Sequence, residues 1–258
     1  MNLTDEFILK CQRGTPVFLK DICAVYPSKL GEIVDTGYDK FNNYLQTILI
    51  EKPLSSEIEN KELREIIKKL TDYEFFLMMT SLDPEFNISA KTAFRFFTHE
   101  NVVFSLEPAQ IIIGPLQEKH IINEEDFLLL RRIIKKMFFL EVGGDEIIIN
   151  ADDNARTRQL KLQMIENRKK VAKAKAKKNS GGDSKIEFSD LVGSVALAVS
   201  GLNMINIWEL TYYSFQDQLK RMGWHEKYYN NMQAALAGAK MKNKQLEYWM
   251  KSISSNDN

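Results

Sequence analysis

The sequence predicts an α+β fold that is predominantly helical, and three observations carry this prediction. Apolar residues recur at steps of three and four over 26–82 and again over 206–253, which is the period of an amphipathic helix. Between these regions, short runs rich in β-branched and aromatic residues have connections too short for crossover helices, which favours a small antiparallel meander. A Lys-rich tract then runs into a Gly- and Ser-containing stretch that has little apolar area to bury.

The first predicted helices cover 26–82. Their apolar positions lie at helical spacing: Leu30, Ile33, Tyr38, Phe41, Tyr44, Leu45 and Ile48. We expect a second helix to begin at a Ser55/Ser56 cap, because a serine side chain accepts a hydrogen bond from the free N–H groups of a first turn. Glu57 and Glu59 would then place negative charge at the positive end of the helix dipole.

Three short runs predict the strands of the meander: AFRFFTH, NVVFSL and QIIIG. They are separated at 99–101 and 107–109, and AFRFFTH alternates less regularly than the other two. A helix follows from Asn123, because three acidic residues come directly after this capping residue. Its predicted buried stripe is Phe127, Leu130, Ile134, Met137 and Phe138.

These elements divide the chain into three parts. A predominantly helical α+β domain is expected over 1–150, ending after a further strand, EIIIN, at 146–150. A long basic helix and a flexible linker follow over 151–187. The remainder, 188–258, is predicted to form a helical bundle module.

The C-terminal module carries the most informative pattern. After a helix of small residues over 190–201, Asn206 and Glu209 have the spacing of a capping box. An apolar seam then follows at steps of four and three: Trp208, Tyr212, Phe215, Leu219 and Met222. A next helix carries Tyr228, Met232, Ala235, Leu236 and Ala239, and a last one carries Leu246, Trp249, Met250 and Ile253. These side chains either form the core of a bundle or stay partly open to bind another protein.

Residues that carry catalytic chemistry do not gather in this sequence. It lacks GxxxxGK[ST], GxGxxG, HExxH and GxSxG. His99, His120 and His225 are far apart and are predicted to be surface or structural residues. Cys11 and Cys23 read as small, buried or half-buried apolar residues. We therefore expect no enzymatic activity, cofactor or metal.

Charge bears on the possible partners. Lys+Arg and Asp+Glu both number 35, so the whole chain has no field that would steer it to nucleic acid. The basic helix 156–178 could contact phosphates, but it has no interleaved aromatic residue to stack on bases, so a solvated helix is the favoured interpretation. The N-terminus has no secretion signal pattern, and the apolar stretch 191–205 is too short to cross a membrane. A cytoplasmic location follows.

The C-terminal residues resemble a known family. They comprise NIWELTYYSFQDQLKRM, with the pattern W-E-(L/M)-T/S-x-x-x-F-x-D, then EKYYNNMQAALAGAK and LEYWMKSI. Together with INEEDFLLLRRIIKKMFFL and EIIIN, they are similar to tail assembly chaperones of tailed bacteriophages that infect Gram-positive bacteria. The resemblance covers about 120–258, and the earlier residues match only through their helical character.

The resemblance implies a non-enzymatic function in the host cytoplasm. Such chaperones bind the tape-measure protein, a long and aggregation-prone helical chain, and recruit tail-tube subunits to it. Self-association would suit the coating of a long client. We expect partner binding at Trp208, Tyr212, Phe215, Leu219, Met222, Leu246 and Trp249. The alternatives are a minor structural tail or baseplate protein of the virion, or a nucleic-acid-binding protein that uses the basic helix 156–178.

Overall fold

The computed structural model of the chain describes residues 5–53, 58–115, 118–140, 186–239 and 248–250, together with 154, 156–157, 160–161 and 164. This part of the chain is predominantly helical and carries two small antiparallel sheets, which confirms the predicted fold class. The elements are α1 (Asp5–Arg13), β1 (Val17–Leu19), β2 (Cys23–Val25), α2 (Leu30–Thr36), α3 (Tyr38–Ile48), α4 (Lys61–Lys69), α5 (Asp72–Leu82), α6 (Pro84–Thr98), β3 (Val102–Leu106), β4 (Ala109–Ile113), β5 (His120–Ile122), α7 (Glu124–Met137), α9 (Phe188–Ala198), the 3-10 helix η2 (Ile207–Glu209) and α10 (Tyr212–Leu236).

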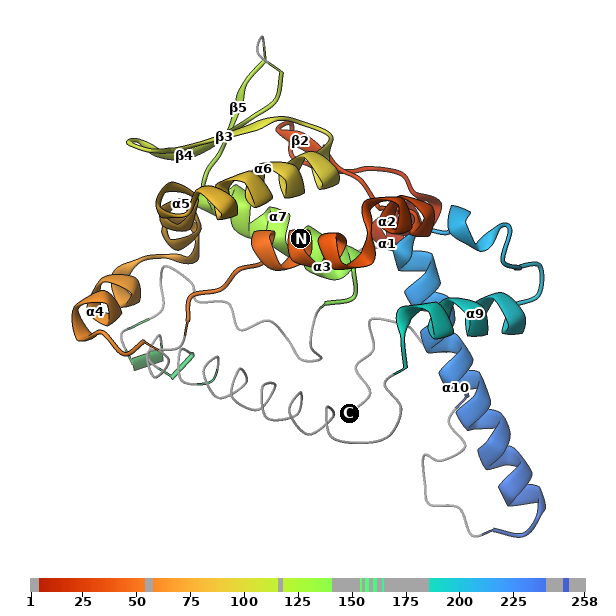
Figure 1. The fold of residues 1–258 in the computed structure, drawn as a ribbon. Coiled ribbons are helices and arrows are strands. Elements are labelled where there is room, and N and C mark those ends of the chain that lie inside the picture. Colours follow the sequence, from red (N-terminus) through yellow and green to blue (C-terminus); the bar gives the residue numbers. More distant parts are fainter. Residues whose placement is uncertain are drawn as a thin grey trace.

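The elements are arranged around a central helical body. Figure 1 shows β3, β4 and β5 extending from one side of this body, while α10 projects away from it at the end where α2 and α9 lie. Helix α4 lies at the opposite end (Figure 1). β1 and β2 form a separate antiparallel hairpin packed on α6 and α7. The described C-terminal segment, 186–239, therefore joins the body at the end where α2 lies.

The core of the body is rich in phenylalanine. The fully buried rings are Phe41, Phe76, Phe94, Phe97, Phe127 and Phe138. The ring of Phe138 lies edge-on to those of Phe41 and Phe97, with centroid distances of 5.3 and 5.4 Å. Such pairs add about 0.5–1.5 kcal/mol beyond the burial of their area. Directional ring contacts therefore help to hold α3, α6 and α7 together.

The first helical region is confirmed as helical but is divided by Gly37. This glycine has φ 95°, a conformation that other residues rarely adopt, and it separates α2 from α3. The next helix was predicted to begin at a Ser55/Ser56 cap. Ser55 and Ser56 lie outside the described residues, and α4 begins only at Lys61. Its cap is Asn60, whose Oδ1 accepts hydrogen bonds from the N–H groups of the first turn at 2.9 and 3.2 Å.

The predicted strand AFRFFTH is wrong, because these residues lie in or directly after the second half of α6. Asp83 caps this helix through hydrogen bonds of 2.9 and 3.1 Å from two first-turn N–H groups, and Pro84 occupies the first helical position. Ala90, Phe94 and Phe97 then fall on one buried face at helical spacing. The periodicity of a short apolar run cannot distinguish a strand from a buried helix. Here the cap at Asp83, which lies well before the run, starts the helix that includes it.

The meander itself is confirmed for NVVFSL and QIIIG, which form β3 and β4. β4 lies between β3 and β5, and all three strands are antiparallel. Tyr73 of α5 fastens the sheet to the body: its hydroxyl donates to Ile122 O at 2.8 Å and accepts from Ile111 N at 3.1 Å. Burial raises the pKa of this hydroxyl, which therefore stays protonated and can keep donating at neutral pH.

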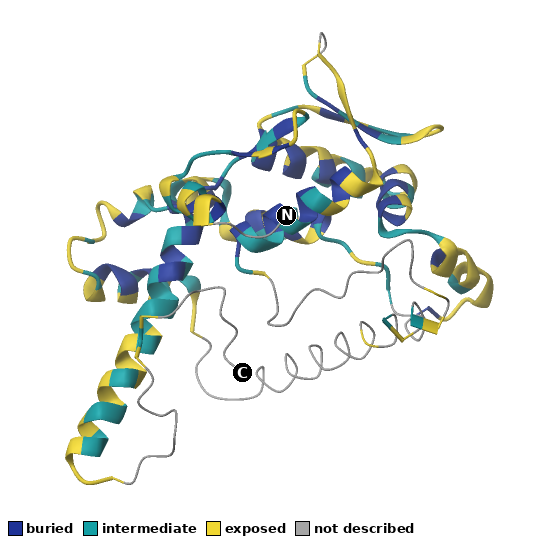
Figure 2. Cartoon of the chain, turned by 180° about the vertical axis from the view of Figure 1, so that it is seen from behind, coloured by how far each residue is buried: buried dark blue, intermediate teal, exposed yellow. Residues whose placement is uncertain are grey.

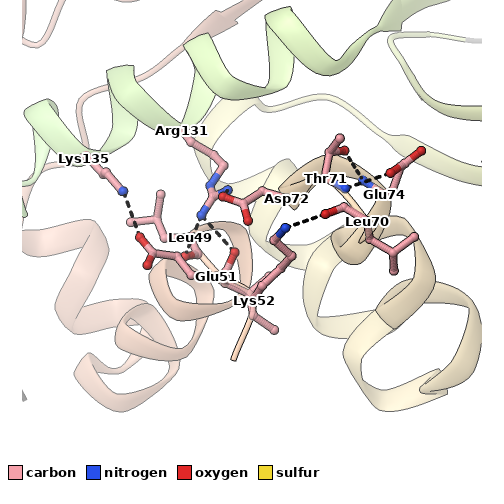
Figure 3. Close-up of polar contacts among 10 residues, drawn as sticks. Leu49, Glu51, Lys52, Leu70, Thr71, Asp72, Glu74, Arg131 and Lys135 are labelled. Carbon is pink, nitrogen blue, oxygen red and sulfur yellow. Dashed lines mark hydrogen bonds and ion pairs between the residues drawn. The ribbon is translucent and has the colours of Figure 1, made fainter. Parts of the chain in front are cut away.

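Helix α7 begins at the predicted Asn123 cap, and its predicted apolar stripe is buried throughout. Arg131 on this helix is 4% exposed although it is charged. Its guanidinium donates to Leu49 O at 3.0 Å and to Ile50 O at 2.9 Å, and forms an ion pair with Asp72 at 3.3 Å. Figure 3 shows how it joins the end of α3 to the start of α5.

Helix α10 differs from the prediction at both ends. It begins at Tyr212, with Thr211 as its cap, whereas Asn206 lies outside the helix. The two helices predicted from this region are one helix of 25 residues that continues through Gly223. A glycine within a helix costs only about 1 kcal/mol, so it need not end one. The predicted helix over 190–201 is confirmed as α9.

Several predicted features lie outside the described residues. They include the strand EIIIN, the linker before 186, Leu246 and Ile253. Of the basic tract, the few described positions from 156 to 164 are helical. Trp249 and Met250 are described and are not in a helix. The predicted domain limits stay a prediction.

Candidate protein-binding site

The C-terminal segment is joined to the body by a short backbone pairing. Lys29 and Thr211 form an isolated antiparallel bridge. On its two sides, Leu30 N donates to Leu210 O at 2.8 Å, and Tyr212 N donates to Ser28 O at 2.8 Å. We call this pairing of 28–30 with 210–212 the junction. Its second half, 210–212, lies within the pattern W-E-(L/M)-T/S-x-x-x-F-x-D that the sequence singled out.

Side chains of the same motif support the junction. The Lys29 ammonium lies 2.7 Å from the Glu209 carboxylate, and this hydrogen bond raises the pKa of Lys29. Gly31 allows the close approach of α2 and η2, because a Cβ at this position would lie 3.3 Å from Trp208 O. The first part of the motif therefore has a structural explanation within the chain.

The second part of the motif attaches α10 to α1. Phe215 is fully buried, with its ring edge-on to that of Phe188 at a centroid distance of 5.6 Å. Asp217 is 4% exposed and accepts hydrogen bonds from Gln12 at 2.9 Å and from Arg221 at 2.8 Å. Ser214 Oγ donates to the Gln12 carbonyl at 3.0 Å. A buried carboxylate needs such partners, and here they fix the position of α10.

Tyr212 connects the two core clusters of the molecule. Its ring lies 5.8 and 5.5 Å from those of Phe41 and Phe138 in the body, and 6.4 Å from that of Phe188 on α9. Burial raises the pKa of its hydroxyl to about 12. Tyr212, which is half-buried, and Phe215, which is fully buried, therefore pack against side chains of this chain, in agreement with the core interpretation of the seam.

The other described residues predicted as contacts are less buried than Phe215. Trp208, Leu219 and Met222 are half-buried and pack against the second core cluster, which contains Phe215. Trp249 is half-buried, with its ring 5.2 Å from that of His225. Leu246 lies outside the described residues. Partner binding by these side chains stays a prediction.

A tightly hydrogen-bonded loop at 199–206 precedes η2. Asn203 Oδ1 accepts from the N–H groups of Ile205 and Asn206 at 2.8 and 3.1 Å. In return, Asn206 Oδ1 accepts from Asn203 N at 2.8 Å, and its Nδ2 donates to Gly201 O at 2.9 Å. The Trp208 indole donates to Met204 O at 2.8 Å. The loop therefore has a defined conformation.

This loop and the helix before it carry three exposed apolar side chains. Leu197 is 90% exposed, Ile205 is 88% exposed and Met204 is 54% exposed. In Figure 2, the loop between α9 and α10 is largely drawn as exposed. We call Leu197, Met204 and Ile205 the loop surface. Sequence reasoning missed it, although the Asn-Met-Ile-Asn order indicated an asparagine-bridged turn with apolar residues at its centre.

A second apolar feature is a hollow of about 270 Å³ between α4, α5 and the β3–β4 hairpin. Its lining consists of Ile66, Leu70, Glu74, Leu77, Met78, Leu106 and Ala109. Among these described residues, Glu74 alone is ionisable, and its carboxylate accepts a hydrogen bond from the Thr71 N–H at 2.8 Å. Such a lining can receive an apolar side chain but supplies no converging groups for chemistry.

The side chains of Cys11, Cys23 and His99 are buried or pack against neighbouring residues. Cys11 and Cys23 are free and buried, as predicted, and burial raises the pKa of both thiols to about 12. His99 is exposed and stacks on Tyr26, with a ring-centroid distance of 4.0 Å. Within the described ranges, no group of three or more His, Cys, Asp or Glu side chains is placed to hold a metal. Of the described helices, none has the length and apolar character to cross a membrane.

The described part of the C-terminal segment is helical, pairs with 28–30 through backbone hydrogen bonds and carries exposed apolar side chains. Residues 175–254 match a family model described as the YomV second domain, a phage-associated domain, and this range includes α9, η2 and α10. The match indicates a phage protein. Neither a curated protein nor a solved structure matches the chain.

Proposed function

We propose that this phage protein is a tail assembly chaperone that binds the tape-measure protein and recruits tail-tube subunits during tail morphogenesis. The observation that supports this proposal best is the loop surface, because it lies within the residues that match the phage-associated domain. A chaperone for a long helical client needs apolar side chains that stay outside its own core.

The geometry of the chain suits weak and repeated binding. The loop surface is small, so a single contact would bury too little area for a stable complex. Several copies along one client would add their contacts through a high effective concentration. Exposed methionines such as Met204 also adapt to varied partner shapes, because their side chains are flexible.

The proposal is tested by co-expression with the long helical protein encoded by the same phage. We expect that the client becomes soluble and co-purifies with the chain, and that the chain is missing from finished particles. A client that stays insoluble and does not co-purify would contradict the proposal. The presence of the chain in purified virions would instead support a structural tail or baseplate component.

A further inference from the structure

We propose that the surface formed by α2, α9 and the 199–206 loop binds a cationic, apolar helix of a partner protein. The inference rests on the proposed function in that it gives the chemistry of the client segment. Its evidence is the exposure of the apolar side chains, the sign of the surrounding charge and the hydrogen bonding of the loop.

The apolar part of this surface is larger than the loop alone. Ile186 precedes α9 and is 67% exposed, and Val34 on the neighbouring α2 is 49% exposed. Together with the loop surface they give this end of the molecule several apolar side chains that the described residues leave in solvent. Single exposed apolar residues are ordinary, but these lie on elements that share the second core cluster at one end of the molecule, which is the basis for treating them as one surface.

The residues of α2 and those from Ile186 to the end of η2 include acidic side chains and no basic ones. Between Ile186 and Leu219 the sequence has no Lys, Arg or His. The exposed acidic residues on α2, before and in α9, and in η2 are Glu32, Asp35, Glu187, Asp190 and Glu209. Lys29, which lies beside them, is already paired with Glu209 at 2.7 Å. An apolar surface with acidic surroundings selects a partner whose apolar residues are flanked by Lys or Arg.

The loop is preorganised for binding. The two asparagines hold its backbone through hydrogen bonds to each other and to the neighbouring N–H and C=O groups. Val199 and Leu202 at its start pack into the second core cluster. A partner would therefore lose little free energy in ordering the loop around Ile205.

The hydrogen bonding also favours a helical partner. The N–H groups of Leu202, Asn203, Ile205, Asn206 and Ile207 all donate within the chain. An extended strand would need free backbone groups here to pair with, whereas a helix satisfies its own backbone and binds through side chains. The surface therefore fits the apolar and cationic side chains of a helix.

The test uses the full chain and two synthetic amphipathic helices, one of leucine and lysine and one of leucine and glutamate, each labelled for fluorescence anisotropy. We expect the lysine helix to bind at least about tenfold more tightly than the glutamate helix. Its affinity should fall as salt is raised, because exposed charges are screened. Equal binding of the two helices, or binding that salt does not weaken, would overturn the proposal.

Matched variants locate the contact. The double variant Leu197→Ser/Ile205→Ser should weaken lysine-helix binding by about tenfold or more. The control Leu82→Ser/Ile88→Ser changes residues of the same types that are 71% and 66% exposed on α5 and α6, and should change the affinity less than about twofold. Circular dichroism establishes that both variants are folded. Equal effects of the two double variants would contradict the location.

The charge is tested separately with Asp35→Asn/Glu187→Gln, which should weaken lysine-helix binding and reduce its salt dependence. Sedimentation of the full chain gives a further outcome. A self-association that disappears in Leu197→Ser/Ile205→Ser would mean that a second copy occupies the surface, which would refute the proposed partner.

These results separate the inference from the proposed function. If the natural client binds and Leu197→Ser/Ile205→Ser has no effect on it, the chaperone function stands and the inference fails. If the lysine helix binds at this surface but the tape-measure protein does not, the inference stands and the proposed function fails.

Discussion

Replacing Phe215 with alanine tests whether the second core cluster holds the C-terminal segment on the body. The ring is fully buried, contacts Phe188 of α9 and shares its cluster with Leu30 of α2. Removing a buried phenylalanine side chain costs about 3–5 kcal/mol. Because neighbours such as Leu219 and Met222 are only partly buried, they can shift toward the space. We therefore expect a loss near the lower end, about 3 kcal/mol.

The assay combines urea unfolding, followed by circular dichroism, with hydrogen exchange. Two amides report directly on the junction, because Leu30 N donates to Leu210 O and Tyr212 N donates to Ser28 O. Both should exchange faster in Phe215→Ala, since α10 is held less firmly.

The matched control is Tyr229→Ala, which removes an aromatic ring from the same helix where it is 50% exposed. This change should alter the free energy of unfolding by less than about 0.5 kcal/mol. For Phe215→Ala, a loss below about 1 kcal/mol with unchanged exchange at the junction would refute the reasoning.

Three further predictions follow from the packing and the buried groups. Gly31→Ala should destabilise the protein by about 1–3 kcal/mol, because the new Cβ would lie 3.3 Å from a backbone oxygen of η2. Gly193→Ala in α9, where the new Cβ would meet no neighbouring atom within 4 Å among the described residues, should instead stabilise it by up to about 1 kcal/mol. Urea unfolding of both variants measures these changes, and equal effects would contradict the prediction. Arg131→Met should lower the free energy of unfolding by about 3–5 kcal/mol, because it leaves the carbonyls of Leu49 and Ile50 without their donor. Arg131→Lys keeps the charge and should lower it less in the same measurement. A loss below about 1 kcal/mol for Arg131→Met would argue against a function of Arg131 in holding α3 to α5. The thiols of Cys11 and Cys23, with pKa values raised from 9.0 to about 12, should resist a thiol reagent at pH 8 until urea unfolds the chain. Their protonation stabilises the folded state below pH 9, and this stabilisation should be lost as the pH rises toward 12. Rapid labelling of the folded protein would disprove their burial.

Local patterns in the sequence were sufficient for some elements. Asn123 followed by acidic residues predicts the start of α7 correctly, because capping depends on neighbours within one turn. The strands β3 and β4 also follow from local composition and a short connection. The second half of α6 was predicted wrongly as a strand, because the apolar run is too short to show a helical period. The cap that starts this helix, Asp83, lies several residues earlier.

The features missed in the sequence depend on residues far apart along the chain. Nothing near Arg131 indicates that its guanidinium will meet the carbonyls at the end of α3. In the same way, the W-E-L-T residues form a recognisable pattern, but their pairing with 28–30 appears only in the folded chain. The sequence suggested an apolar seam that was either core or contact surface, and only the folded chain shows Phe215 buried against Phe188 of α9 and Trp208 outside α10.

The junction also has a consequence for the order of events during synthesis. Leu30 has no exposed area in the finished protein, yet the residues that cover it belong to α9, η2 and α10. Domains generally begin to fold from the N-terminal end while translation continues, so the body can form while this leucine still faces solvent. Nascent chains that have not reached Ile207 carry an uncovered apolar site, and ribosome-bound intermediates of this protein would be open to chaperone capture there until α10 emerges.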